Sequence, residues 1–186
     1  MANERDIGCL LIEDPLYGVG CLCETARALG RRGVRTEVFR WDARARLYPS
    51  LQRAYQRVRR DGATNAIVAQ GAGCDCALAL SCQLPADRLV LLEPVQWRET
   101  GDAARQLRRI RAFARQNAAF CVADALIVPG PHTPDDLPGR LRRDLTSALS
   151  TLSRELGELW PVRKEDFNLA LFQYLSEGVL PKSLAE

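Results

Sequence analysis

Short apolar runs alternate with segments of helical periodicity along this chain, and this alternation constrains its fold more than any other feature. Most of the runs are followed by Gly, Pro or acidic residues, a pattern typical of short buried strands. The apolar runs that we expect to form strands cover residues 9–12, 65–69, 88–92 and 125–128. Residues 34–39 alternate Val34, Thr36 and Val38 with Arg35, Glu37 and Phe39, which also predicts a strand.

The segments between these runs carry apolar residues three and four positions apart, as in helices with one buried face. Expected helices cover 21–29, 47–60, 74–84, 101–120, 137–156 and 165–175, although 148–152 could instead form a short strand. Strands that alternate with helices form a mostly parallel sheet covered on both faces. We therefore predict one domain over 1–186, a three-layer α/β/α fold with a doubly wound sheet of roughly five or six strands.

Composition narrows the possible partners. The net charge of +3 is too small to favour nucleic acid. No apolar stretch approaches the roughly 20 residues that span a bilayer, and the polar N-terminus lacks a signal-peptide core. We expect a cytoplasmic protein without a membrane span. The seven cysteines, an odd number without a secretion signal, favour reduced thiols.

The letters VAQGAGC at 68–74, followed by ALAL at 77–80, resemble the nucleophile elbow of α/β hydrolases, a strand, a tight G-x-S-x-G turn and a small-residue helix. The flanking segments are also similar to that family: ALGRRGV at 28–34, RLVLLEP at 88–94, WP at 160–161 and EDFNLAL at 165–171. The resemblance covers roughly residues 8–176 by order and spacing, and no cap domain fits between 94 and 125.

Carried over position by position, the resemblance implies a degenerate catalytic apparatus. Gly71 stands at the nucleophile position and has no side chain to attack a carbonyl. Glu158 stands near the histidine position, and Glu13-Asp14 replaces the start of the oxyanion loop, where carboxylates would repel a developing oxyanion. The acid position falls in the loop 131–136, on Thr133, Asp135 or Asp136.

The first hypothesis is therefore an α/β-hydrolase-like protein that has lost serine-hydrolase activity. It would bind a small apolar or acyl ligand, or act as an accessory protein, and would need no cofactor or metal. Ligands of such sheets bind at the carboxyl ends of the strands. Residues from the loops at this edge form the expected pocket: Asp14, Gln70, Gly71, Ala72, Trp97 and His132.

A working ester or thioester hydrolase with an unorthodox nucleophile is the alternative. Cys74 begins the expected helix after the turn, where a helix N-terminus lowers the pKa of a thiol. His132, the only histidine, would be its base, and Ser81 is a more distant candidate nucleophile. Ordinary burial of a small residue explains Cys74 equally well.

Three further hypotheses remain. The Cys-x-Cys pairs could bind zinc through Cys21, Cys23, Cys74 and Cys76, although the spacing is shorter than usual. Some loops, including Glu13-Asp14, resemble those of response-regulator receiver domains. That family needs a phosphoacceptor Asp after the third strand and a Lys after the fifth, and Ala69-Gln70 and Pro129 stand at those places. The chain could also be a non-catalytic subunit or form oligomers, using apolar residues of the last helix, Phe167, Leu171, Phe172 and Leu175.

Overall fold

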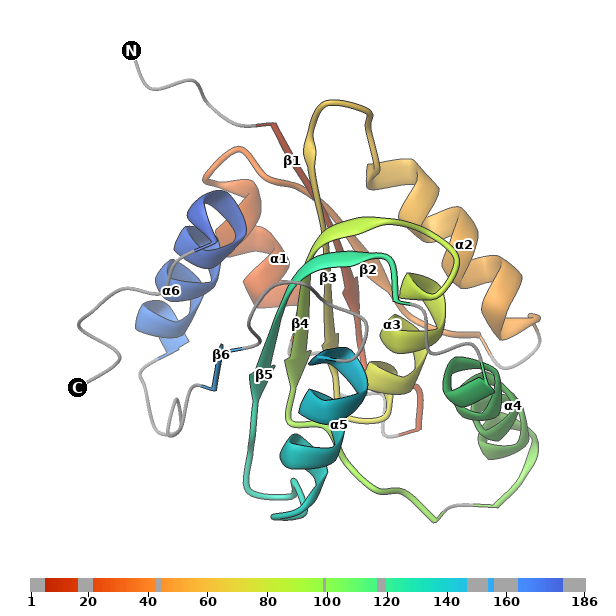
Figure 1. Cartoon of the computed structure of the whole chain (residues 1–186). Coiled ribbons are helices and arrows are strands. Elements are labelled where there is room, and N and C mark those ends of the chain that lie inside the picture. Colours follow the sequence, from red (N-terminus) through yellow and green to blue (C-terminus); the bar gives the residue numbers. More distant parts are fainter. Residues whose placement is uncertain are drawn as a thin grey trace.

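The computed structural model describes residues 6–16, 22–42, 45–98, 100–116, 120–146, 154–155 and 164–178. It confirms the predicted three-layer α/β/α fold with a parallel sheet (Figure 1). The strands follow the order β2-β1-β3-β4-β5-β6, and every neighbouring pair is parallel. Their bounds are β1 Ile7–Ile12, β2 Arg35–Phe39, β3 Thr64–Gln70, β4 Ala86–Leu92, β5 Val122–Val128 and β6 Arg154–Glu155.

The central strands are buried on both faces, which explains their continuous apolar runs. All six residues of β1 are buried. Leu10 and Ile12 contribute to the core on one face of the sheet, whereas Cys9 and Leu11 contribute to the core on the other. The alternation of side chains along a strand divides the core in this way.

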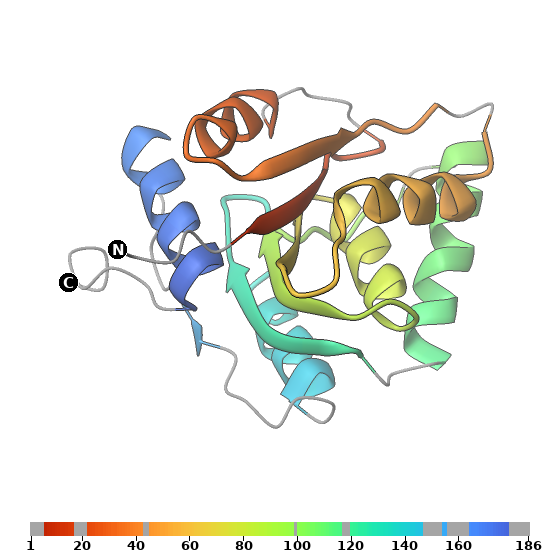
Figure 2. The same ribbon diagram turned by 90° about the horizontal axis from the view of Figure 1, so that it is seen from above.

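Helices cover both faces (Figure 2). The first and last helices share one core with the sheet, and the second, third and fourth share the other. Leu141 of the fifth helix packs against the core that the second, third and fourth helices share. The bounds are α1 Leu22–Gly30, α2 Leu47–Val58, α3 Gly73–Ser81, α4 Asp102–Gln116, α5 Leu137–Thr146 and α6 Lys164–Glu177. No helix within these described ranges could cross a membrane.

Some expected boundaries were wrong. The helix expected over 101–120 ends at Gln116, because the chain is already entering β5 at Cys121, whose N–H donates to the Ser81 carbonyl at 2.7 Å. The helix expected over 137–156 ends at Thr146, and 154–155 pair with β5 as a strand. The alternative strand over 148–152 lies outside the described residues.

Two features of this fold position a site. Strand β1 lies between β2 and β3, so the chain reverses its direction across the sheet at the β1–β3 pair, where α/β proteins bind ligands. Helix α4 packs against α3, and α5 packs against β5 (Figure 1). A cavity is lined by α3 and α4 on one side and α5 on the other, and extends from the turn after β3 to Phe120, which precedes β5.

Candidate functional site

The tight turn between β3 and α3 centres on Gly71, as the sequence predicts. Gly71 has φ of +58°, in the left-handed region that favours glycine. Its N–H donates to the Leu92 carbonyl of β4 at 3.0 Å, and its carbonyl accepts the N–H of Cys74 at 3.2 Å. These two bonds fix the direction in which the chain leaves β3 and enters α3.

The Asp14 carboxylate fills the space above this turn. A Cβ atom built on Gly71 would overlap Oδ2 of Asp14 and lie 3.0 Å from its Cγ. Oδ2 also accepts the N–H of Ala72 at 2.9 Å, and Oδ1 accepts the N–H of Leu16 at 2.8 Å. Burial raises the pKa of Asp14, the two N–H groups oppose that rise, and the negative charge of Glu93 adds to it.

This contact bears directly on the resemblance. In an α/β hydrolase, the backbone N–H that follows the nucleophile is one donor of the oxyanion hole. The corresponding N–H here belongs to Ala72, and it already binds the carboxylate of Asp14. The Asp14 carboxylate thus occupies the space of a side chain at position 71 and accepts the N–H of the following residue.

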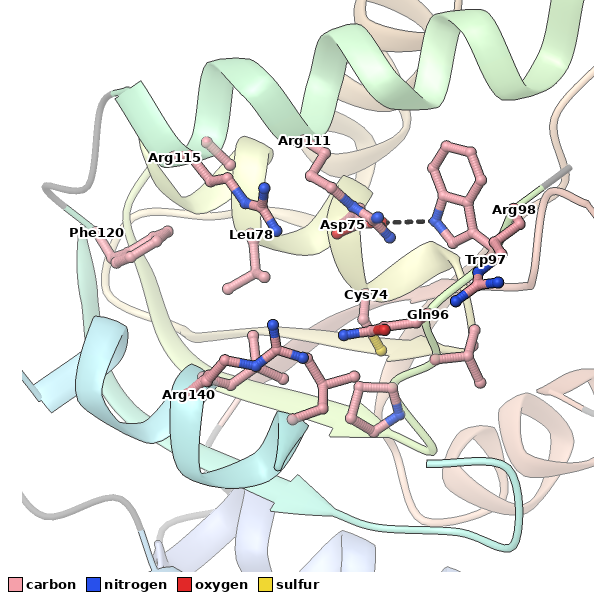
Figure 3. A pocket seen from close by; sticks show the side chains of 16 residues that line it. Cys74, Asp75, Leu78, Gln96, Trp97, Arg98, Arg111, Arg115, Phe120 and Arg140 are labelled. Carbon is pink, nitrogen blue, oxygen red and sulfur yellow. Dashed lines mark hydrogen bonds and ion pairs between the residues drawn. The ribbon is translucent and has the colours of Figure 1, made fainter. Parts of the chain in front are cut away.

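A cavity of about 730 Å³ opens beside Gly71. Its walls come from the turn and α3, from the segment after β4, from α4 and from α5 (Figure 3). The apolar part of its lining includes Leu78, Val95, Trp97, Phe120, Leu137 and Leu141.

A polar network forms one wall of the cavity. Asp75, in the first turn of α3, accepts a hydrogen bond from Trp97 Nε1 at 2.8 Å. The same oxygen of Asp75 accepts bonds from Arg111 Nε at 3.0 Å and Nη2 at 2.6 Å. The Arg111 guanidinium also lies over the Trp97 ring, 4.5 Å from its centroid. This network joins α3, α4 and the segment after β4 into one wall.

Arginines dominate the charge of the cavity. Among the described residues that line it, there are four arginines, Arg98, Arg111, Arg115 and Arg140, and a single carboxylate, that of Asp75. Arg115 extends from α4 and Arg140 from α5, and Figure 3 shows both directed into the space between these helices. The lining is therefore positively charged as well as partly apolar.

Cys74 lies at the base of the cavity in an environment that opposes ionisation. Its side chain is buried, and its Sγ faces the carbonyl oxygens of Ala69 at 3.5 Å and Leu92 at 3.7 Å. Burial raises the pKa of the Cys74 thiol well above its ordinary value. The two carbonyls accept the S–H, so the neutral thiol is the favoured form.

His132 is engaged elsewhere. Its side chain is 82% exposed, and its Nδ1 lies 2.6 Å from Glu93 Oε1. The same carboxylate oxygen accepts the backbone N–H of His132 at 3.2 Å. Ser81, the more distant candidate nucleophile, is buried and donates to the Leu78 carbonyl at 2.9 Å. The structure thus gives each proposed nucleophile, and the proposed base, a partner of its own.

The cysteines are dispersed rather than gathered around one point. Cys23 accepts a hydrogen bond from Arg40 at 3.0 Å, and Cys76 is buried in the core. Cys21 lies outside the described residues. Within the described part of the chain, no group of three or more His, Cys, Asp or Glu side chains is placed to hold a metal ion.

The expected pocket coincides only partly with the cavity. Gly71 and Trp97 line it. The other expected pocket residues lie in the strands and loops at the same edge of the sheet, namely Asp14, Gln70, Ala72 and His132. Of the acid candidates, Thr133 accepts the Gly130 N–H at 3.0 Å and Asp136 pairs with Arg140. Glu158 and Trp160 lie outside the described residues.

Sequence reasoning missed the charged lining. In the sequence, a solvated helix face explains the basic run from Arg108 to Arg115 as well as an anionic partner does. Asp75 belongs to no recognisable sequence motif. One signal was present: Arg111 and Arg115 are four residues apart, with Ala114 beside them, so both lie on one side of a helix. What the sequence does not give is the position of α4, which turns that side toward a cavity.

The last helix faces inward more than the subunit hypothesis expects. Leu171 and Leu175 are buried against the sheet, and Phe167 and Phe172 are partly buried on the same core. Leu169, which that hypothesis did not include, is the large apolar residue of α6 that is exposed.

Comparison with known proteins adds no family to this description. No model of a known protein family matches the chain, and a search of curated protein sequences finds no match.

Proposed function

We propose that this chain is an α/β-hydrolase-like protein that has lost serine-hydrolase activity and binds a small apolar or acyl ligand in the cavity beside Gly71. The observation that carries the proposal is the position of Asp14. Its carboxylate lies where a nucleophile side chain would begin and accepts the N–H of Ala72. A carbonyl substrate would meet neither a nucleophile nor a free oxyanion donor at this turn.

The cavity supports a binding role. Its volume of about 730 Å³ lies within the range of roughly 300–1,000 Å³ that is typical of small-molecule sites. Its lining combines apolar side chains with a few polar groups, the composition expected of a site that holds a ligand of this size. The Asp75 network keeps Trp97 in one orientation at its wall.

The alternative of an unorthodox hydrolase has less support. A nucleophilic thiol needs a lowered pKa and a base within hydrogen-bond reach. Burial raises the pKa of Cys74, and His132 is bound to Glu93. Ester turnover that disappears in Cys74→Ala would nevertheless restore this alternative.

Two measurements test the proposed function. A fluorophosphonate probe should leave the protein unlabelled under conditions that fully label an active serine esterase. Decanol, an uncharged apolar probe, should bind saturably, and Leu141→Trp should weaken binding by placing a larger ring in the apolar lining. Leu169→Trp, on the exposed side of α6, is the matched control and should bind like the wild type. Labelling at a serine, or decanol binding that Leu141→Trp leaves intact, would contradict the proposal.

A further inference from the structure

Two arginines face the same space from opposite walls of the cavity. Arg115 comes from the last turn of α4, and Arg140 from the first turns of α5, more than twenty residues later in the chain. Both line the cavity, and Figure 3 shows their guanidinium groups directed toward the space around Leu78. Two cations that converge in this way repel each other unless an anion lies between them.

The described residues supply little negative charge to this space. Among them, Asp75 is the only carboxylate in the lining, and its bonding oxygen already accepts three hydrogen bonds from Trp97 and Arg111. Within the described part of the chain, no carboxylate forms an ion pair with Arg115. Among the described acids, Asp136 pairs with Arg140 from outside the cavity lining, and the charge of Arg115 has no such partner.

Arg140 is also incompletely satisfied. Its Nη2 lies 3.1 Å from Asp136 Oδ2, a solvent-exposed carboxylate one turn earlier in the chain. The Nε and Nη2 atoms are nonetheless shielded from solvent, and neither forms a hydrogen bond to a described residue. The Arg140 side chain is 38% exposed as a whole, so its positive charge faces the cavity although these two atoms are shielded.

We propose that the ligand of this cavity is an amphipathic anion, with a carboxylate or phosphate head bound between Arg115 and Arg140. This inference rests on the proposed function, since it names the chemistry of the ligand for the same cavity. Guanidinium groups suit such heads because their planar donors match two oxygens of a carboxylate or phosphate at once.

The apolar lining defines the rest of the ligand. Leu78 lies between the two arginines in Figure 3. Phe120 extends the apolar surface on one side, and Leu137 and Leu141 extend it along α5. An inorganic anion would leave these side chains uncovered, whereas an alkyl or acyl chain attached to the head would bury them.

Calorimetric titration of the whole chain tests the proposal with four probes that separate charge from chain. Decanoate and decyl phosphate carry both, decanol carries only the chain, and inorganic phosphate carries only the charge. The variants are Arg115→Gln and Arg140→Gln. Arg109→Gln is the matched control, because Arg109 lies on the exposed side of the same helix as Arg115. Thermal unfolding of each variant verifies that it is folded.

We expect decanoate or decyl phosphate to bind more tightly than decanol, and the tighter of the two identifies the head. Arg115→Gln and Arg140→Gln should each weaken binding of the anion by about tenfold, the size of one charge-assisted hydrogen bond. Both should leave decanol binding unchanged, and Arg109→Gln should resemble the wild type. Added salt should weaken the binding of the anion and leave the binding of decanol unchanged.

The opposing outcomes are distinct. If decanol binds as tightly as decanoate and decyl phosphate, the charge inference is wrong and the proposed apolar cavity stands. If inorganic phosphate binds as tightly as decyl phosphate, the site recognises an anion alone and the amphipathic ligand is wrong. If none of the four probes binds, both this inference and the proposed function fail.

Discussion

The Oδ2 atom of Asp14 occupies the space into which any side chain at Gly71 would project. The same atom accepts the N–H of Ala72, so one carboxylate from the loop after β1 holds the turn after β3. The contact crosses the β1–β3 pair, the point where the strand order reverses. At this turn, the Asp14 carboxylate therefore takes the place of any side chain at position 71.

Gly71→Ala should destabilise the protein by about 3 kcal/mol. Placing a side chain in the left-handed region costs about 1–2 kcal/mol, and displacing the packed Asp14 carboxylate adds a comparable overpacking cost. Urea unfolding of both proteins measures the difference in the free energy of unfolding. Gly139→Ala is the control, because Gly139 lies in α5 with open space around it, and it should leave the stability unchanged or raise it.

The steric part of this cost should depend on Asp14. In an Asp14→Ala background the space beside Gly71 is empty, so Gly71→Ala should cost at least about 1 kcal/mol less than in the wild type. Equal costs in the two backgrounds would show that Asp14 does not fill that space. In the wild-type background, Gly71→Ser should likewise destabilise the protein, because its side chain also meets the Asp14 carboxylate. It should create no esterase activity, since His132, the only histidine of the sequence, is bound to Glu93.

Periodicity and turn residues were sufficient to predict most of the fold. Strands buried on both faces leave continuous apolar runs, and four such runs correspond to β1, β3, β4 and β5, whereas β2 was predicted from its alternating pattern. The helix ends were harder to predict. The amphipathic pattern of α4 continues to Phe120 in the sequence, whereas the helix ends at Gln116 and Cys121 N–H donates to the Ser81 carbonyl. A contact between residues forty positions apart leaves no local signal.

Part of the candidate site could be predicted from the sequence and part could not. The Gly71 turn could be identified because a tight strand–turn–helix connection imposes small residues on contiguous positions. The cavity could not, because its walls depend on how far α4 and α5 stand apart. Arg115 and Arg140 are separated by β5 and its flanking loops in the chain, and each by itself is indistinguishable from an exposed helical arginine.

Asp75→Ala should loosen the wall formed by Trp97 and Arg111. The change leaves one indole N–H and one guanidinium without their shared acceptor, at sites that are mostly buried. We expect a loss of about 2 kcal/mol in the free energy of unfolding, less than for a fully buried pair because some solvent reaches it. Tryptophan fluorescence should shift as Trp97 loses its hydrogen bond.

Asp61→Ala is the control that separates the effect of Asp75→Ala from the loss of any surface charge. Asp61→Ala removes a fully exposed partner of Arg59 and should alter neither the urea midpoint nor the fluorescence. An Asp75→Ala protein as stable as Asp61→Ala would mean that the network contributes nothing to the fold.

Thiol alkylation should follow burial. With iodoacetamide at neutral pH in the folded protein, the exposed Cys121 should react first, while Cys9, Cys74 and Cys76 should stay unmodified until urea is added. Peptide mass spectrometry at successive times gives the order. Modification of Cys74 at a rate equal to that of Cys121 would reveal an activated thiol and favour the hydrolase alternative.

Alkaline pH should destabilise the fold through its buried thiols. Burial raises the pKa of Cys9 from its ordinary value of 9.0 to about 12 and that of Cys82 to about 11. Because the folded state holds these protons more tightly, the stabilisation is fully present below pH 9 and is lost as pH rises toward 11 and 12. The fully buried Cys9 should cost about 1.4 kcal/mol per pH unit across its window, and the partly exposed Cys82 should cost less because solvent screens it.

Urea unfolding in the presence of a reductant, at pH 8 and at pH 10.5, measures this loss. Cys9→Ala should reduce the difference between the two pH values, because it removes one group whose pKa burial has raised. Cys121→Ala, at an exposed position, should leave that difference as it is in the wild type. Tyr55, whose hydroxyl donates to the Pro85 carbonyl at 2.7 Å and whose pKa burial also raises, contributes in the same direction in both variants. A difference that Cys9→Ala does not change would mean that the Cys9 thiol ionises as easily in the folded chain as in the unfolded one.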